Sequence, residues 1–335
     1  MIHTRARGLA TGALLAAVTL LAACGTTEPA ASQTTVSEAP ESSSGPLTFT
    51  DGRGEEVTLP DGPATRVVVL EWSQAEAVVS LGVEPVGLAD VAGYTSWVGT
   101  AAPLTNEPTD VGVRREPSIE TIATLEPDLI LGSVGSIPDS AMEQMERIAP
   151  IALMTGANGD DPLGLMRSEF TTIATALGQE DNAEKILATY DDTIAANAQK
   201  LADAGLEGAP IVLSSPYADG ANVTIRMHGP RTTVQAVAND MGLTPAWEDP
   251  GDEQWGLSNI DLEGLTNLPD NTRFFYWGND TSESIDALES AALWQDLPFV
   301  KEDHVYRGAV GIWAYGGPVS MTAWSNDITN QLTAP

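Results

Sequence analysis

The sequence predicts two three-layer α/β lobes joined by a single long helix. Strand-length apolar runs alternate with helical patterns along most of the chain, which favours mostly parallel sheets. A short pattern occurs in both halves, within Asp110–Leu131 and again within Ile260–Asp270, which indicates two related lobes. The stretch 161–206 between these halves has helical periodicity and no strand pattern.

The first 23 residues have the pattern of a bacterial lipoprotein signal peptide. Arg5 and Arg7 supply the positive start, and the apolar run Leu9–Leu20 is short for a bilayer span. This run leads into Leu-Ala-Ala-Cys24, which resembles a lipobox, so we expect residues 1–23 to be removed and Cys24 to carry the lipid. The alternative is an ordinary buried thiol. Cys24 is the only cysteine of the chain, which excludes an intrachain disulfide.

Residues 24–46 are rich in Ser, Thr, Pro and Ala and lack apolar periodicity, so we expect a disordered, lipid-anchored tether. Such a tether would hold the folded part at the outer face of the cytoplasmic membrane, on the extracellular or periplasmic side. The remaining chain is expected to form an N-terminal lobe at 47–160, a helical linker at 161–207 and a C-terminal lobe at 208–335.

The elements of the N-terminal lobe follow from alternation and from Gly and Pro at the ends of apolar runs. In Asp110–Leu131, apolar residues at helical spacing lead to a Pro-Asp pair and then to a short buried strand. The expected elements are a hairpin at Leu47–Pro60, a strand at Arg66–Leu70, a helix at Gln74–Leu81, a strand at Val83–Leu88, the helix and strand of Asp110–Leu131, and a helix near Ser140–Arg147.

The linker contains two helical patterns, and the second runs for about 22 residues from Asp181, enough to extend roughly 33 Å and bridge two lobes. The alternative is a surface helix of one lobe. The C-terminal lobe is expected to contain a strand at Pro210–Ser214, a helix at Thr232–Met241, the second copy of the repeated pattern, a strand at Arg273–Trp277 and a final helix at Val319–Leu332.

Composition and motifs exclude several function classes. Fifteen Lys and Arg against 47 Asp and Glu give a net charge of −32, which disfavours nucleic acid and anionic lipid as partners. The chain lacks G-x-S-x-G, P-loop and G-x-G-x-x-G motifs, so we expect neither an enzyme nor a cofactor. His228 and His304 stand alone in the sequence, so we expect surface or core histidines and no metal site. A lipoprotein hydrolase with a Ser or Asp in its cleft is the alternative of a different class.

Aromatic residues are the best candidates for a binding site. They fall in loops and at strand ends, where an α/β lobe opens its crevice, whereas Trp294 and Trp324 lie on predicted helices and are expected in the core. The candidate wall residues are Trp72, Tyr94, Trp97, Trp255, Trp277, Trp313 and Tyr315.

A series of motifs extends along nearly the whole chain beyond residue 60. They are RVVVLEW at 66–72, LGVEPVGLAD at 81–90, YTSWV at 94–98, DVGVRREPSIE at 110–120, ERIAP at 146–150, GPRTTVQAVANDMGLTPAW at 229–247, QWG at 254–256 and LWQDLPFVKEDHVYR with VGIWAYGG at 293–317. Together these motifs resemble those of ferric hydroxamate siderophore-binding proteins, in the iron-complex branch of ABC-transporter solute-binding proteins. This resemblance implies two α/β lobes joined by one long helix.

The resemblance implies a role for individual residues. Arg114 would donate hydrogen bonds to the hydroxamate oxygens, whereas Arg115 has no such counterpart. The family's pocket Tyr is replaced by Ser136, which changes the expected selectivity. The aromatic residues expected to line the ligand site are Trp72, Tyr94, Trp97, Trp255, Trp313 and Tyr315. Iron would be held by the siderophore and not by the protein.

The resemblance also implies docking on a permease dimer, through Glu120 on one lobe and Glu263 on the other, with Asp261 as a competitor for the second role. The alternative is that each Glu only stabilises the start of a helix. We therefore expect a monomeric, lipid-anchored binding protein that delivers a ferric hydroxamate siderophore to an ABC importer and its ATPase. The alternative ligands are a catecholate siderophore, haem or cobalamin, and the net acidity weakly disfavours trianionic catecholates.

Overall fold

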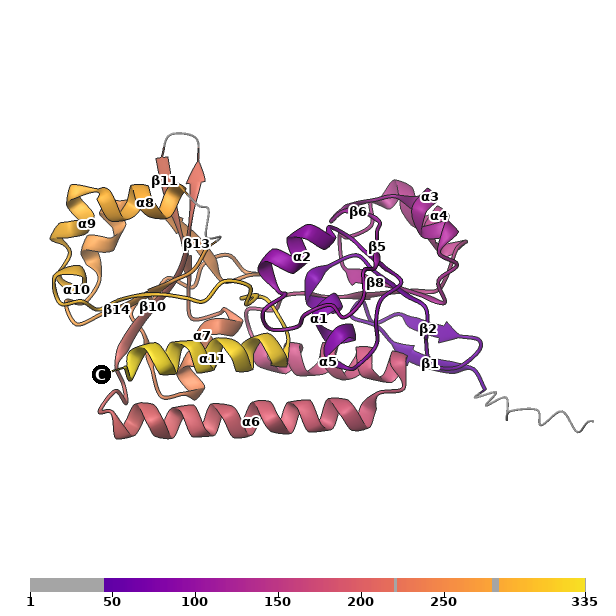
Figure 1. The fold of residues 1–335 in the computed structure, drawn as a ribbon, viewed down its shortest axis with the longest axis horizontal. Coiled ribbons are helices and arrows are strands. Elements are labelled where there is room, and N and C mark those ends of the chain that lie inside the picture. Colours follow the sequence, from indigo (N-terminus) through magenta and orange to yellow (C-terminus); the bar gives the residue numbers. More distant parts are fainter. Residues whose placement is uncertain (1–44, 220–221, 279–282, 335) are drawn as a thin grey trace, which may run out of the picture. The chain divides into compact units, whose positions relative to one another are not determined.

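The computed structural model of the protein describes residues 45–219, 222–278 and 283–334 (Figure 1). The predicted signal peptide, Cys24 and nearly all of the predicted tether lie outside the described residues, so those expectations stay predictions. No helix among the described residues combines the length and the apolar character that a membrane crossing requires.

The first lobe is built on a five-stranded parallel sheet in the order β5-β4-β3-β8-β9. Strands β3 and β8 are buried along most of their length, as expected for a parallel sheet covered on both faces. The strands are β3 (Val67–Val69), β4 (Gly87–Leu88), β5 (Thr109–Asp110), β8 (Leu129–Ser133) and β9 (Ile151–Met154). The helices are α1 (Trp72–Ser80), α2 (Val91–Trp97), α3 (Ile119–Thr124) and α4 (Asp139–Glu146).

Neighbouring residues of β3 enter different cores, because successive side chains of a strand point to opposite faces. Val67 and Val69 pack in the core that contains α1 residues, whereas Val68 packs in the core that contains Ile122 of α3 and Met145 of α4. The lobe therefore has three layers, as the sequence predicted.

Two small hairpins complete this lobe. The first follows the predicted Leu47–Pro60 hairpin, and the second carries Arg114 in its turn. The strands are β1 (Leu47–Thr50), β2 (Glu56–Leu59), β6 (Gly112–Val113) and β7 (Glu116–Pro117).

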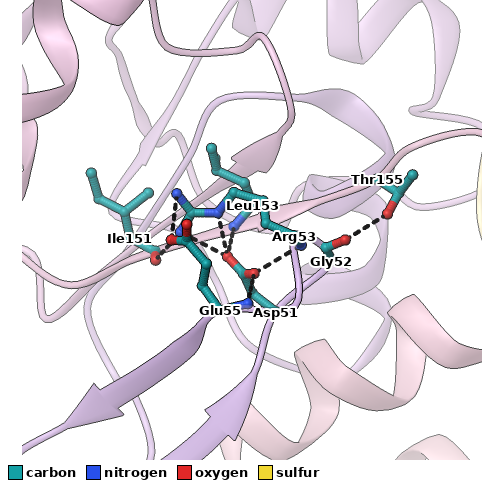
Figure 2. A network of polar contacts seen from close by, with 7 residues as sticks. All are labelled: Asp51, Gly52, Arg53, Glu55, Ile151, Leu153 and Thr155. Carbon is teal, nitrogen blue, oxygen red and sulfur yellow. Dashed lines mark hydrogen bonds and ion pairs between the residues drawn. The ribbon is translucent and has the colours of Figure 1, made fainter.

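A polar network holds the first hairpin on β9 (Figure 2). The buried carboxylate of Asp51 forms an ion pair with Arg53 at 2.8 Å and accepts a hydrogen bond from the Leu153 backbone N–H at 3.0 Å. The Gly52 carbonyl accepts a hydrogen bond from the Thr155 hydroxyl at 2.9 Å. The hairpin turn is therefore hydrogen-bonded to β9 and to Thr155, the residue that directly follows β9.

The second lobe has a mixed sheet in the order β13-β11-β10-β14-β15, with β12 beside β10. Its strands are β10 (Pro210–Asp219), β11 (Asn222–His228), β12 (Thr244–Pro245), β13 (Leu257–Ile260), β14 (Arg273–Tyr276) and β15 (Val305–Arg307). Its helices are α7 (Thr233–Asp240), η1 (Leu262–Asn267), α8 (Glu283–Ser290), α9 (Ala292–Asp296), α10 (Pro298–Lys301) and α11 (Pro318–Leu332). Ile211 and Leu213 pack with α7 and α11, whereas Val212 packs on the opposite face with α8 to α10, which again gives three layers.

The predicted long helix is present as α6 (Glu180–Asp203), whose 24 residues extend about 36 Å. Its first turn contributes Ala183 to the core of the first lobe, and its later turns contribute Tyr190 and Leu201 to the core of the second. Helix α5 (Pro162–Leu177) also serves both cores, through Phe170 in the first and Met166 in the second. Figure 1 shows α5 running alongside part of α6.

The repeated pattern forms different helices in the two halves. In the first half it gives α3, with Ser118 as the N-terminal cap, followed by β8. In the second half it gives the 3₁₀ helix η1, with Asp261 as the cap, followed by β14. Both helices have six residues, so their length does not explain the difference in helix type. The expectation of a helix leading into a strand is therefore met with a different helix type in the second lobe.

Replacing Asp51 by Ala should lower the free energy of unfolding by about 2–4 kcal/mol, because it leaves the Arg53 guanidinium and the Leu153 N–H without their buried partner. Urea unfolding monitored by circular dichroism would measure this change. Glu55→Ala is the matched control, because Glu55 is the solvent-exposed partner of the same Arg53, at 3.2 Å, and should cost less than about 1 kcal/mol. Equal losses in the two variants would contradict a special role for the buried carboxylate.

Candidate functional site

The first-lobe half of the site is centred on Arg114. The residue lies in the β6–β7 turn, which Gly112 and Arg115 shape by adopting positive φ values of 102° and 72°. The Arg114 guanidinium carbon lies 3.8 Å from the centre of the Trp72 ring, and its Nη1 donates to the Glu71 carboxylate at 2.6 Å. Arg114 is thus held by a cation–π contact and an ion pair while about a third of its side chain stays exposed.

Glu71 and Trp72 occupy the point where β3 passes into α1. The Glu71 carboxylate accepts a hydrogen bond from the Trp72 backbone N–H at 3.0 Å and so caps the helix. The same carboxylate neutralises Arg114, which leaves the pair with no net charge. Sequence analysis missed Glu71, although its place at the carboxyl end of a predicted strand was a usable signal.

An aromatic cluster connects the two lobes. Trp313 lies 5.1 Å from Trp72 and 5.9 Å from Trp97, both of the first lobe, measured between ring centres. It also lies 5.1 Å from Tyr315, which contacts Trp255 of the second lobe at 5.6 Å. These contacts are edge-on, the arrangement that the ring quadrupoles favour. The segment that contains Trp313 and Tyr315 therefore joins aromatic residues predicted on separate lobes.

Trp255 is positioned by a loop that requires a glycine after it. The Asp252 carboxylate accepts hydrogen bonds from the backbone N–H groups of Trp255, at 2.7 Å, and Leu257, at 3.1 Å. Gly256 has φ +67°, and a Cβ there would lie 2.8 Å from the Cβ of Arg231. Only glycine fits this conformation and this spacing, which gives a physical reason for the Trp-Gly pair.

Two polar contacts tie α1 of the first lobe to the start of α11. The Ser73 hydroxyl donates to the Tyr315 carbonyl at 2.9 Å. The Glu76 carboxylate accepts from the Ser320 backbone N–H at 2.8 Å and from its hydroxyl at 2.6 Å. Glu76 is buried, and burial raises the pKa of its carboxyl, while the bonds from Ser320 act against that rise.

A cavity of about 60 Å³ lies between α1, α5 and the second lobe, next to Trp255 and Tyr315. Its lining includes the buried side chain of Gln74, the carboxylate of Glu169 and the imidazole of His228. Glu169 accepts a hydrogen bond from the Gly156 N–H at 2.9 Å, and burial raises the pKa of its carboxyl. A volume of this size holds about two water molecules.

His228 is a buried neutral residue that supports the cluster. Its ring lies 4.6 Å from Trp277 and 5.7 Å from Tyr315, and its Nε2 is hydrogen-bonded to the Ser215 hydroxyl at 3.0 Å. Burial, with the nearby positive charge of Arg226, lowers the pKa of His228 to about 3. The expectation of a hydrogen-bonded core histidine is therefore met.

Most of the predicted site residues come together, and two of the candidate wall residues, Tyr94 and Trp277, do not. Arg114, Trp72, Trp97, Trp255, Trp313 and Tyr315 form the connected cluster described above. Tyr94 is a correction: its side chain is 0% exposed and its hydroxyl donates to the Ala102 carbonyl at 2.8 Å, so it belongs to the first-lobe core. Tyr94 is the buried residue of α2 and packs in the first-lobe core.

Ser136 and the candidate core residues can also be placed. Ser136 is buried and its hydroxyl accepts a hydrogen bond from the Ser133 N–H at 3.0 Å, so it closes the turn after β8. Trp294 and Trp324 are buried in the second-lobe cores, as expected. Trp277 is a correction: it was a candidate wall residue, but it is buried in the second-lobe core, because packing of the sheet against α7 and α11 covers its side chain. Among the residues that the structure describes, no group of three or more His, Cys, Asp or Glu is arranged to hold a metal ion.

Glu120 and Glu263 are both exposed in the first turns of α3 and η1. The caps are supplied by other side chains, because Ser118 accepts from the Thr121 N–H and Asp261 from the Gly264 N–H at 3.1 Å. Asp261 is therefore occupied as a cap, which leaves Glu263 as the better candidate for a partner contact.

Comparison with known proteins adds to this geometry. The profile of the periplasmic binding protein family matches residues 67–309. The iron(3+)-hydroxamate-binding protein FhuD of Escherichia coli is 30% identical over 267 residues, which cover 80% of this chain and 86% of FhuD. The Fe(3+)-citrate-binding protein YfmC of Bacillus subtilis is 29% identical, with 82% and 83% covered. The crystal structure of Fe3+–Desferal-bound FhuD from Vibrio cholerae has a TM-score of 0.71 at 28% identity, with 81% of this chain and 98% of that chain covered.

Neutral His228 should make stability depend on pH. The unfolded chain binds a proton near pH 6.5, whereas the folded protein does so only near pH 3, so the stability that neutral His228 gives is complete above pH 6.5 and falls as the pH drops toward 3. At pH 5 the loss should be about 2 kcal/mol relative to pH 7. Thermal unfolding at both pH values, for the wild type and for His228→Gln, would measure it.

The difference between wild type and variant isolates His228, because burial of Glu76 and Glu169 raises their pKa values and makes acidification favour the folded state at those two positions. Between pH 7 and pH 5 the wild type should lose about 2 kcal/mol more than His228→Gln. The same pH dependence in both proteins would show that the buried imidazole does not titrate in this way.

Proposed function

This chain belongs to the periplasmic binding protein family, and we propose that it binds a ferric hydroxamate siderophore between its lobes and delivers it to an ABC importer. Proteins of this family that resemble the chain are non-enzymatic transport binders of iron complexes, so the broad class of the ligand is an iron–siderophore complex. The finer assignment, to hydroxamates, rests on the chemistry of the aromatic cluster and Arg114.

The observation that carries the proposal is the stacking of Arg114 on Trp72, inside a cluster of aromatic rings that reaches both lobes. A ferric complex presents chelator oxygens on a compact, largely apolar body. Flat rings can cover that body, and a guanidinium can donate charge-assisted hydrogen bonds to its oxygens. Residues from both lobes would then touch one ligand, as capture between lobes requires.

The charge of this half of the site favours a neutral complex. Three singly charged hydroxamates balance the three positive charges of ferric iron. Glu71 already neutralises Arg114, so the pair offers donor N–H groups without a surplus of positive charge. The relatives named for hydroxamate or Desferal binding support the same ligand class.

Replacing Arg114 by Ala should weaken binding of a ferric hydroxamate by about 1.5–3 kcal/mol, because charge-assisted hydrogen bonds to the chelator are lost. Quenching of tryptophan emission would measure the dissociation constant, since four indoles lie in the cluster. Ferrichrome, ferrioxamine, ferric enterobactin and haem would form the ligand panel, and the first two should bind best.

Arg115→Asn is the matched control for Arg114→Ala. It removes a neighbouring positive charge, and Asn tolerates the positive φ of 72° at that position. We expect unchanged affinity in this control. Equal affinities of wild type and Arg114→Ala, with both proteins folded by thermal unfolding, would refute the role of Arg114.

We further infer that the protein acts outside the cytoplasm, tethered through a lipid on Cys24, and that it meets the permease as a monomer. The signal-peptide pattern supports the anchor. Relatives from Bacillus subtilis include one named as a siderophore-binding lipoprotein. Glu120 and Glu263, one on each lobe, are the proposed contacts with the two permease subunits, because both are exposed and neither is the cap of its helix.

Changing Glu120 and Glu263 together to Ala should leave siderophore affinity unchanged and abolish uptake, because only the contact with the permease is lost. Uptake of radiolabelled iron complexed with ferrichrome, in cells that depend on this protein, would measure the effect. Glu180→Ala with Asp181→Ala is the control, since these exposed acids also lie in the first turn of a helix and remove the same charge. Normal uptake by the Glu120 and Glu263 variant would exclude the docking role.

A further inference from the structure

The β10–β11 hairpin presents a polar face that sequence analysis did not single out. Ile225 and Met227 of β11 enter the second-lobe core, so Arg226 and His228 lie on the opposite face of the strand. Ser215 of β10 is paired directly with Arg226 and is hydrogen-bonded to His228. Arg226 therefore shares a face with a residue that contacts the aromatic cluster.

Arg226 reaches the cluster itself. Its guanidinium carbon lies 4.8 Å from the centre of the Tyr217 ring. Burial raises the pKa of the Tyr315 hydroxyl, and the positive charge of Arg226 nearby acts against that rise. Tyr315 in turn contacts Trp313 and Trp255. A second guanidinium is thus placed at the cluster from the second lobe, while Arg114 approaches it from the first.

The two arginines differ in how their charge is balanced. Glu71 pairs with Arg114 at 2.6 Å, whereas no carboxylate in the described part of the chain lies within ion-pair distance of Arg226. The arginines that do pair with a described acid are Arg53, Arg114, Arg147, Arg167 and Arg231.

Half-burying a guanidinium against aromatic rings removes part of its hydration, and an anion restores the lost interaction. The guanidinium carries five N–H donors in a planar fork, which suits a carboxylate. Asp252, the acid whose charge also acts on Tyr315, is occupied by backbone N–H groups of its own loop. The balancing charge is therefore best supplied from the ligand side.

We propose that Arg226 is a specificity-determining residue that favours ferric siderophores carrying a free carboxylate on the side facing the second lobe. The inference rests on the proposed function, because it takes the aromatic cluster as the ligand site. The neutral Arg114–Glu71 pair would bind the chelator oxygens, and Arg226 would bind a peripheral carboxylate of the same ligand.

Two ferric trihydroxamates test this division of roles: one neutral, and one with the same chelating groups and a free carboxylate on its periphery. In Arg226→Met, which keeps length and apolar bulk, affinity for the carboxylate-bearing complex should fall about tenfold or more, and affinity for the neutral complex less than about threefold. Arg226→Lys should recover part of the preference, and added salt should weaken it in the wild type. Tryptophan quenching would give all the dissociation constants.

Arg147→Met is the charge-matched control, because Arg147 is an exposed residue after α4, paired with Glu143 outside the aromatic cluster, and should leave both affinities unchanged. Equal losses of affinity for both ligands in Arg226→Met would overturn the inference and would indicate that Arg226 only holds Tyr315 in place. Unchanged affinities would overturn it as well. If the wild type bound neither complex, both the proposed function and this inference would be wrong. If the wild type bound both complexes and Arg226→Met had the same selectivity between them, only this inference would be wrong.

Discussion

The contact between α1 and the start of α11 is the constraint on which the site depends. Glu76 of α1 accepts two hydrogen bonds from Ser320, and Ser73 donates to the Tyr315 carbonyl. These bonds fix the segment before α11 against the first lobe, although the helix belongs to the second. Trp313 is thereby held against Trp72, the first residue of α1. One helix therefore supplies both a wall of the site and the anchor for the aromatic segment.

This constraint also explains a local feature of the sequence. A Cβ on Gly316 would lie 2.1 Å from the Glu76 carboxylate and 2.6 Å from the Cβ of Ser320, so the approach of α11 to α1 requires glycine there. Pro318 then begins α11, where a missing N–H leaves no intrahelical bond unmade. Gly316 in the run Tyr-Gly-Gly-Pro is thus required by the buried carboxylate of Glu76, which lies far away in the sequence.

Local patterns were enough to predict most of the fold. The alternation of β3, α1 and β4 and the long periodic stretch of α6 each depend on residues close in sequence. The site was predicted through resemblance for Arg114 and through loop position for the tryptophans. The burial of Tyr94 was not predicted, because it depends on packing across the first lobe, and a loop-like position in the sequence does not reveal that packing. Glu71 and Arg226 were missed since their roles arise from partners far along the chain.

The distribution of charge reconciles an acidic protein with a site built on arginines. At physiological ionic strength, charges separated by more than about 8 Å are largely screened, so the net charge of −32 acts weakly on a ligand already in contact with the cluster. At contact distance the nearest groups decide the interaction. Arg114 is balanced by Glu71, and Arg226 lies half-buried against the Tyr217 ring, where a guanidinium is less screened than at the surface. The surface acids can therefore serve solubility and partner contacts while two arginines set the chemistry of the site.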